Sequence, residues 1–139
     1  MTSLSRAKPL LTFAALAALA ACADGAGQGA DVTKTDFKPN YLGTQTILLD
    51  GELVDLRVAM NGARDRDDVS NYARCAAAQY ALIRGYGFVR HLRTNIAESG
   101  GTWRADAVYT ISSVLPLGSM TIDAETMVRD CRAQGIPTV

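Results

Sequence analysis

The chain has 139 residues, its 14 Lys and Arg side chains are balanced by 14 Asp and Glu, and 48% of it is hydrophobic. This length favours a single domain, and balanced charge without basic clusters argues against a nucleic-acid-binding protein. Only one histidine is present, which excludes a metal site built from several histidines.

Residues 1–21 have the pattern of a secretory signal peptide. Arg6 and Lys8 form a positively charged start, and residues 10–21 are apolar except for one threonine. This apolar run is too short to cross a bilayer as a helix, which needs about 20 residues, and its small-residue end is typical of a cleaved signal. The closing residues Leu19-Ala20-Ala21-Cys22 resemble the lipobox of bacterial lipoproteins.

The lipobox resemblance implies that the Cys22 thiol receives diacylglycerol and that cleavage makes Cys22 the new N-terminus. The alternative is an ordinary secretory signal followed by a chance cysteine. The mature chain is slightly acidic, so attachment to a membrane would rest on acyl chains, of which two or more hold stably. Ala23, rather than Asp, follows Cys22, and by the enterobacterial sorting rule this implies the outer membrane, facing the periplasm.

The mature chain divides into a tether and a folded unit. Residues 22–43 are small, polar and glycine-rich, which predicts a flexible tether, and residues 44–139 are predicted to form one domain. Its first element is a hairpin, in which residues 44–49 and 52–60 flank the turn sequence Asp50-Gly51. Apolar and polar side chains alternate in the second run, which predicts a strand with one buried face.

A helix is predicted next, beginning at Asp65 or Asp67 as the N-cap and running to about Arg84, with Gly85 as the C-terminal cap. Its apolar side chains fall on one stripe at helical spacing. The stripe contains Val69, Tyr72, Ala73, Ala76, Tyr80 and Ile83.

Two strands and a short helix complete the domain. Residues 88–95 and 102–114 are predicted strands around a turn at residues 98–101, and residues 124–134 are a predicted helix capped by Asp123. The order β-β-α-β-β-α predicts an α+β fold, with an antiparallel-rich sheet covered on one face by helices. On the second of these strands Trp103, Ala105, Ala107, Tyr109 and Ile111 share one face, and Arg104, Asp106, Thr110 and Ser112 share the other.

Cys75 and Cys131 are the cysteines that remain after modification of Cys22. Two cysteines beyond the inner membrane lie in an oxidising compartment, so we expect a disulfide that staples the short helix to the long one. The alternative is a redox-active pair, but catalytic dithiols usually sit close together as Cys-X-X-Cys.

The remaining polar residues predict no catalytic, cofactor or metal site. His91 could act as a general base only beside a nucleophile, and no serine of the chain lies in a Gly-X-Ser-X-Gly elbow. The acidic run Asp65, Asp67 and Asp68 turns helical instead of continuing as a calcium loop, which favours helix capping. The sequence Gly85-Tyr86-Gly87 follows a helix and lacks the dinucleotide-binding pattern.

Four arginines at predicted strand positions could line one surface of the sheet: Arg57, Arg90, Arg93 and Arg104. One interpretation is a solvated sheet face. The other is a groove for an anionic partner.

The chain resembles a family of small alphaproteobacterial lipoproteins of unknown function. Besides the lipobox, the resemblance rests on a strand at 54–60 with its Asn-Gly turn, the helix and glycine turn at 72–89, and the helix start at 122–128. It covers residues 50–130 and implies no catalytic residues. We therefore expect a non-enzymatic, lipid-anchored envelope protein that presents a sheet surface to a partner, and we infer no small-molecule substrate.

The chain is also similar to the peptidoglycan-binding domain of outer-membrane proteins. The nearest match to that domain's helix start is Val69-Ser70 followed by Ala73-Arg74. This similarity leaves a peptidoglycan-binding module open as an alternative, with Arg64, Asp67 and Arg74 as the residues to test. A redox-active envelope module is the other alternative.

Overall fold

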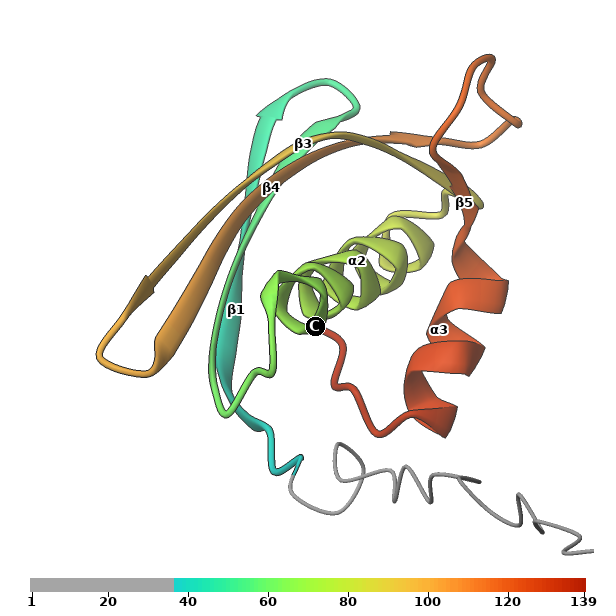
Figure 1. The fold of residues 1–139 in the computed structure, drawn as a ribbon. Coiled ribbons are helices and arrows are strands. Elements are labelled where there is room, and N and C mark those ends of the chain that lie inside the picture. The colour runs from blue at the N-terminus through green and yellow to red at the C-terminus, as the bar shows by residue number, and fades with distance from the viewer. Residues whose placement is uncertain (1–36) are drawn as a thin grey trace, which may run out of the picture. The chain divides into compact units, whose positions relative to one another are not determined.

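The structure is a computed structural model, and it describes residues 37–139; the predicted signal peptide, Cys22 and the tether up to residue 36 lie outside the described residues. The fold is α+β, as predicted, with a five-stranded antiparallel sheet and two helices (Figure 1). The elements are β1 (Asn40–Asp50), β2 (Leu53–Asn61), α2 (Arg66–Ile83), β3 (Phe88–Ser99), β4 (Thr102–Ser112), β5 (Thr121–Asp123) and α3 (Ala124–Ala133).

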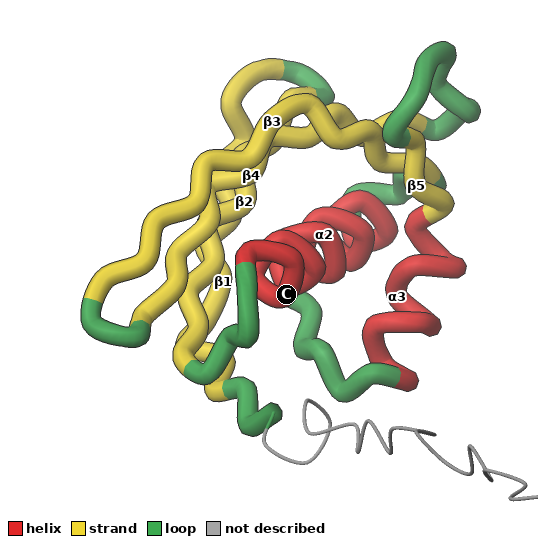
Figure 2. The backbone as a smooth tube through the Cα atoms, viewed as in Figure 1, coloured by secondary structure: helices red, strands yellow, loops and turns green. Residues whose placement is uncertain are grey.

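The strands lie in the order β1-β2-β4-β3-β5, and the sheet curls around α2, with α3 on the same side (Figure 2). Sequence analysis missed β5, which has three residues and pairs with the start of β3. A strand this short has too few residues to show the alternation by which strands are predicted.

Two strands are longer than predicted. β1 begins at Asn40, so residues 40–43, assigned above to the tether, pair with β2 instead. β3 continues to Ser99 because Gly100 and Gly101, both with positive φ, make the tight turn into β4. Two consecutive residues with positive φ form the turn that suits a two-residue hairpin.

The core lies between the inner face of the sheet, which we define as the face toward α2, and the helix itself. β2 contributes every second side chain to it, as the alternation predicted, and β4 contributes the predicted apolar set from Ala105 onward. Alanines on α2 let the helix lie close to the curved sheet. The fully buried members include Val54, Leu56, Met60, Val69, Ala73, Ala76, Ala77, Ala78, Ala81, Val89, Ala107 and Ile111.

The apolar stripe predicted for α2 is wrong at its C-terminal end. Ile83 is 62% exposed and Tyr80 is only partly buried, whereas Ala77, Ala78 and Ala81 are fully buried. The stripe assumed one covered side, but the curled sheet and α3 together cover α2 from more than one direction.

Both helices begin and end as their sequences predicted. Asp65 is the N-cap of α2, where its Oδ1 accepts the N–H groups of Asp67 at 2.9 Å and Asp68 at 3.3 Å. At the other end, the Gly85 N–H donates to Leu82 O and the Tyr86 N–H to Ala81 O, the paired bonds that close a helix at a glycine. Asp123 caps α3 by accepting the Thr126 N–H at 2.8 Å.

The first described residues are held against the start of α2. The Arg64 guanidinium lies 3.9 Å above the Phe37 ring and forms two side-chain hydrogen bonds with the Asp68 carboxylate, at 2.7 and 3.0 Å. A Cβ at Gly62 would collide with the carbonyl oxygen of Lys38, so this close approach requires glycine. Tyr41 packs edge-on against Tyr72, with ring centroids 4.7 Å apart.

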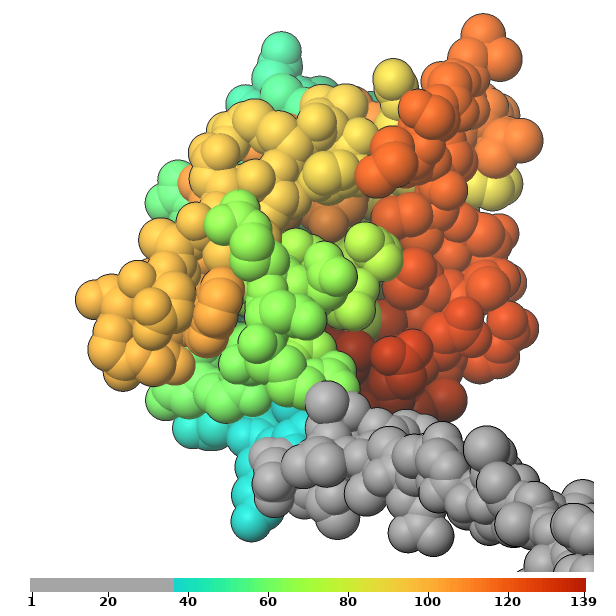
Figure 3. Space-filling view, in the orientation of Figure 1, coloured from blue at the N-terminus to red at the C-terminus, as the bar shows by residue number. Residues whose placement is uncertain are grey.

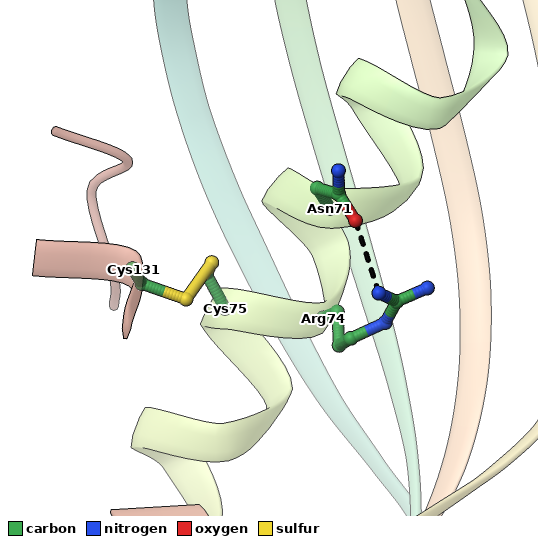
Figure 4. Close-up of a disulfide and its surroundings, with 4 residues drawn as sticks. All are labelled: Asn71, Arg74, Cys75 and Cys131. Atoms are coloured by element: carbon green, nitrogen blue, oxygen red, sulfur yellow. Dashed lines mark hydrogen bonds between the residues drawn. A yellow bond between two sulfur atoms is a disulfide. The ribbon is translucent and has the colours of Figure 1, made fainter. Parts of the chain in front are cut away.

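A disulfide joins α2 to α3. Cys75 and Cys131, the pair for which sequence analysis expected a bond, are linked, with their Cα atoms 5.9 Å apart (Figure 4). α3 has ten residues, and a helix of this length is marginal by itself. The bond therefore fixes a weak element to the body of the domain.

Candidate binding groove on the outer face of the sheet

The outer face of the sheet, which points away from α2, carries two neighbouring rows of polar and small side chains. Residues directly paired on neighbouring strands point to the same face, so the printed register gives each row. One row places Gly43, Ala59, Arg104 and Ala97 side by side across four strands. The next row is entirely polar and consists of Gln45, Arg57, Asp106 and Asn95.

These two rows line a groove with a volume of about 670 Å³. In the first row Gly43, Ala59 and Ala97 have little or no side chain, which leaves space beside Arg104 and the polar row. The groove crosses β1, β2, β4 and β3, so a segment lying in it would contact four strands.

Ion pairs neutralise most of the positive charge beside the groove. The Arg57 Nε lies 3.0 Å from Asp55 Oδ2 and 3.6 Å from Asp106 Oδ2, and the Arg93 Nη1 lies 3.4 Å from Asp106 Oδ1. All three pairs have at least one half-exposed member, so each contributes little to stability. These pairs hold the side chains of Arg57 and Arg93 in place, so neither guanidinium is fully available to another partner.

Of the two arginines that line the groove, Arg104 is the one without an ion pair. It is exposed, and the ion pairs and side-chain hydrogen bonds found among residues 37–139 do not include its guanidinium. Its neighbours across the sheet, Ala59 and Ala97, offer no acceptor. A guanidinium with five donors in a fixed fork therefore stands at the groove ready to bind a carboxylate.

Asp55 is a buried carboxylate beside the groove. It is paired in register with Ile47 and Val108, and its Oδ1 has no hydrogen-bond partner. Burial raises the pKa of Asp55, the neighbouring Asp106 raises it further, and the hydrogen bond from Arg57 lowers it. The ionised form of Asp55 is therefore disfavoured in the folded protein relative to water.

The structure brings only part of the predicted arginine surface together. Arg57 and Arg104 line the groove and Arg93 lies in the adjoining row, but Arg90 is at the opposite end of β3. There its Nε donates to the Ser119 carbonyl at 3.3 Å. The groove is therefore built by two of the four arginines, with a third nearby.

The other candidate residues from the sequence, His91 and the acidic run at the start of α2, have partners within the domain. His91 lies opposite Tyr109 on the inner face, with Nε2 2.7 Å from Thr94 Oγ1, and burial followed by the charge of Arg74 lowers its pKa. The acidic run at the start of α2 caps the helix and pairs with Arg64. Within residues 37–139, no three His, Cys, Asp or Glu side chains are grouped as a metal site requires.

Most residues of the two alternative functions have partners within the domain. Arg74 donates to Asn71 Oδ1 at 3.0 Å and points away from the disulfide (Figure 4), while Arg64 is held by Asp68. Cys75 and Cys131 are each only 1% exposed, so a thiol from another protein cannot reach the bond without local opening. Redox exchange requires such access.

Sequence analysis placed Arg57, Arg104 and Asp106 on strand surfaces but missed the other residues of the two rows. Gln45, Asn95 and Asp106 belong to three different strands, and only the register of the sheet places them in one row. The signal that could have indicated the groove was the recurrence of small residues, Ala59 and Ala97, at outward strand positions beside charged ones.

No helix within residues 37–139 has the length and apolar character needed to cross a membrane.

Comparison with known proteins gives a family for the folded part. The profile of the YNQ4 C-terminal domain matches residues 41–135. An uncharacterised 26.9 kDa protein in the nqo8 5' region of Paracoccus denitrificans is 32% identical over 85 residues, which are 61% of this chain and 33% of that protein. The match thus spans about a third of the relative's length, and no solved structure matches significantly.

Proposed function

The chain belongs to the YNQ4 C-terminal domain family, and from this we propose that its folded part is a binding module, not an enzyme, on a lipid-anchored protein of the bacterial cell envelope. A domain that forms a third of a longer relative suits a module that works beside other segments. The observation that carries the proposal is the outer-face groove with its unpaired Arg104.

The partner that fits this groove is an acidic segment of an envelope protein. Arginine binds a carboxylate through two parallel hydrogen bonds, and Arg104 is free to do so, whereas Arg57 and Arg93 are engaged with Asp55 and Asp106. The polar row offers amide donors and acceptors. The groove spans three strand spacings, about 14 Å, which matches roughly four extended residues.

The anchor is supported by the lipobox at residues 19–22, which lies outside the described residues, and by the disulfide. A buried disulfide suits an oxidising compartment such as the periplasm. By the sorting rule applied to Ala23, the protein faces the periplasm from the outer membrane.

Photo-crosslinking at Gln45 tests the groove. We expect a cross-linked envelope protein from intact cells, and we expect Arg104→Glu to remove it because the substitution reverses the charge that meets the carboxylate. Arg104→Lys keeps the charge but loses the fork, so it should reduce the yield only in part.

Arg132→Glu on α3 is the matched control, because Arg132 is also exposed and does not line the groove. Equal yields from Arg104→Glu and Arg132→Glu would contradict the groove proposal. Retention on purified sacculi that depends on Arg64, Asp67 or Arg74 would instead favour the peptidoglycan alternative.

Cell fractionation tests the anchor. Cys22→Ser removes the thiol that would be acylated, and we expect the variant to move from the membrane pellet to the soluble fraction. A variant that remains in the pellet would contradict lipid anchoring through Cys22 and would leave the groove experiment unaffected.

A further inference from the structure

The loop at residues 113–120, between β4 and β5, exposes an unusual amount of apolar surface. Leu117 is 92% exposed, and Val114, Leu115 and Met120 are each more than half exposed. No residue of the loop is charged. The loop projects beyond the body of the domain (Figure 3), so these side chains are presented outward and do not pack onto the core.

The base of this loop is held in place by β3. The His91 N–H donates to the Met120 carbonyl at 3.1 Å, and the Arg90 Nε donates to the Ser119 carbonyl at 3.3 Å. Met120 has a φ of 64°, a left-handed conformation that is uncommon for a residue other than glycine. Backbone in such conformations is retained where the surroundings impose it, often at binding sites.

Two further exposed apolar side chains belong to segments whose backbone is hydrogen-bonded to the loop or to the residue before it. Leu92, 44% exposed, directly follows His91, which binds the base of the loop. Ile83, the last residue of α2, is 62% exposed. Four residues later, the Gly87 N–H donates to the carbonyl of Ser112, which directly precedes the loop. The four exposed apolar side chains of the loop lie close together in the sequence, whereas scattered single apolar residues are ordinary on a protein surface.

We propose that the loop at residues 113–120 inserts its apolar side chains into the surface of a lipid bilayer. A convex tip fits a bilayer because lipids deform around it, whereas a protein partner would need a matching pocket. Arg90 stands at the base of the tip, where a guanidinium can reach phosphate while its stem stays in apolar surroundings. Insertion of this kind lies in the interface and requires no membrane-spanning helix.

The geometry of the proposed anchor, on which this step rests, allows contact with the same bilayer. The described chain begins at the end of the domain away from the loop (Figure 1). β4, with 11 residues, is about 36 Å long, and the segment between Cys22 and Phe37 can extend to about 50 Å. An anchored domain can therefore lie along the membrane and reach it with the loop.

Fluorescence quenching tests the insertion. The chain has one tryptophan, Trp103, at the opposite end of β4, so the variant Trp103→Phe, Leu117→Trp carries its only tryptophan on the loop. Both full-length proteins, as purified from a bacterial host, are mixed with vesicles of phosphatidylethanolamine and phosphatidylglycerol that have brominated acyl chains. We expect bromine to quench the tryptophan at position 117 several-fold more strongly than Trp103 of the wild type.

Two substitutions make the test specific. Adding Leu115→Asp to the Leu117→Trp protein should remove the difference in quenching, whereas Val139→Asp, which charges an exposed apolar residue outside the loop, should preserve it. Equal quenching at positions 117 and 103 would overturn the proposal. So would a photo-crosslinker at position 117 that captures a protein in cells and no lipid.

The Cys22→Ser protein separates this inference from the proposed anchor. Quenching at position 117 that persists in this variant supports the loop as a membrane contact by itself, even if fractionation shows that the anchor proposal is wrong. Absence of quenching at position 117 in a Trp103→Phe, Leu117→Trp protein that keeps Cys22 and fractionates with membranes would overturn the loop proposal and leave the anchor standing.

Discussion

The two faces of the sheet differ although they are made by the same strands. On β2, Leu56 is fully buried against α2, whereas the next residue, Arg57, is half exposed and contacts two carboxylates on the outer face. The inner face is fixed by packing against a helix that the sheet surrounds. The outer face carries charge, small side chains and a groove, so a binding site can be built there without disturbing the core.

Truncation at these adjacent positions gives the largest contrast. Leu56→Ala should lower the free energy of unfolding by about 3 kcal/mol, because the fully buried site cannot collapse completely around the cavity. Arg57→Ala should cost about 1 kcal/mol, because the Arg57 side chain is half exposed and only the hydrogen bond to buried Asp55 is lost. Urea denaturation measures both, and similar costs for the two variants would contradict the division into a packed face and an open face.

The disulfide gives the next largest effect, on the packed side. Cys131→Ala should lower the free energy of unfolding by about 2–4 kcal/mol and the melting temperature by at least about 8 °C. The bond closes a loop with a sequence separation of 56 residues, which restricts the unfolded chain. A melting temperature unchanged by reduction of the wild type would show that α3 does not depend on the bond, while groove cross-linking at 25 °C should survive in either case.

Two buried carboxylates, one on each side of the sheet, should respond to pH in opposite ways. On the helix side, hydrogen bonds from Arg64 lower the pKa of Asp68 more than burial raises it. The stability that ionised Asp68 contributes is fully present when the pH is above its pKa in the unfolded chain, near 3.8. This stability is lost as the pH falls through the lower pKa of the folded protein. Asp68→Asn should therefore cost about 1–2 kcal/mol at pH 7, and urea midpoints at a series of pH values should show this cost shrinking in acid.

On the outer face, Asp55 should show the smaller and opposite effect. Because its pKa is raised by burial and by Asp106, the wild type loses stability as pH rises from the unfolded value through the higher folded pKa. Asp55→Asn keeps the shape without the charge, so it should be more stable than wild type at pH 7 and equal to it in acid. A loss of stability at pH 7 would show that the Arg57 pair outweighs burial.

The sequence determined the local structure of this protein. Asp65 and Asp123 cap the helices, glycines close them, and alternation on β2 and β4 gives the buried face, because each of these patterns acts over a few neighbouring residues. The α+β class and the partners in the disulfide followed from the same patterns together with the cysteine count. The lipobox is likewise a local pattern, and its prediction awaits the fractionation experiment.

The tertiary structure decided which residues meet. The curl of the sheet buried the alanine side of α2 and left Ile83 exposed, an outcome that one helical stripe could not reveal. Register brought Gln45, Arg57, Asp106 and Asn95 into one row and left Arg90 at the far end. Strand order and register depend on pairing between segments far apart in the chain, so the groove and its unpaired Arg104 could be found only once the strands were in place.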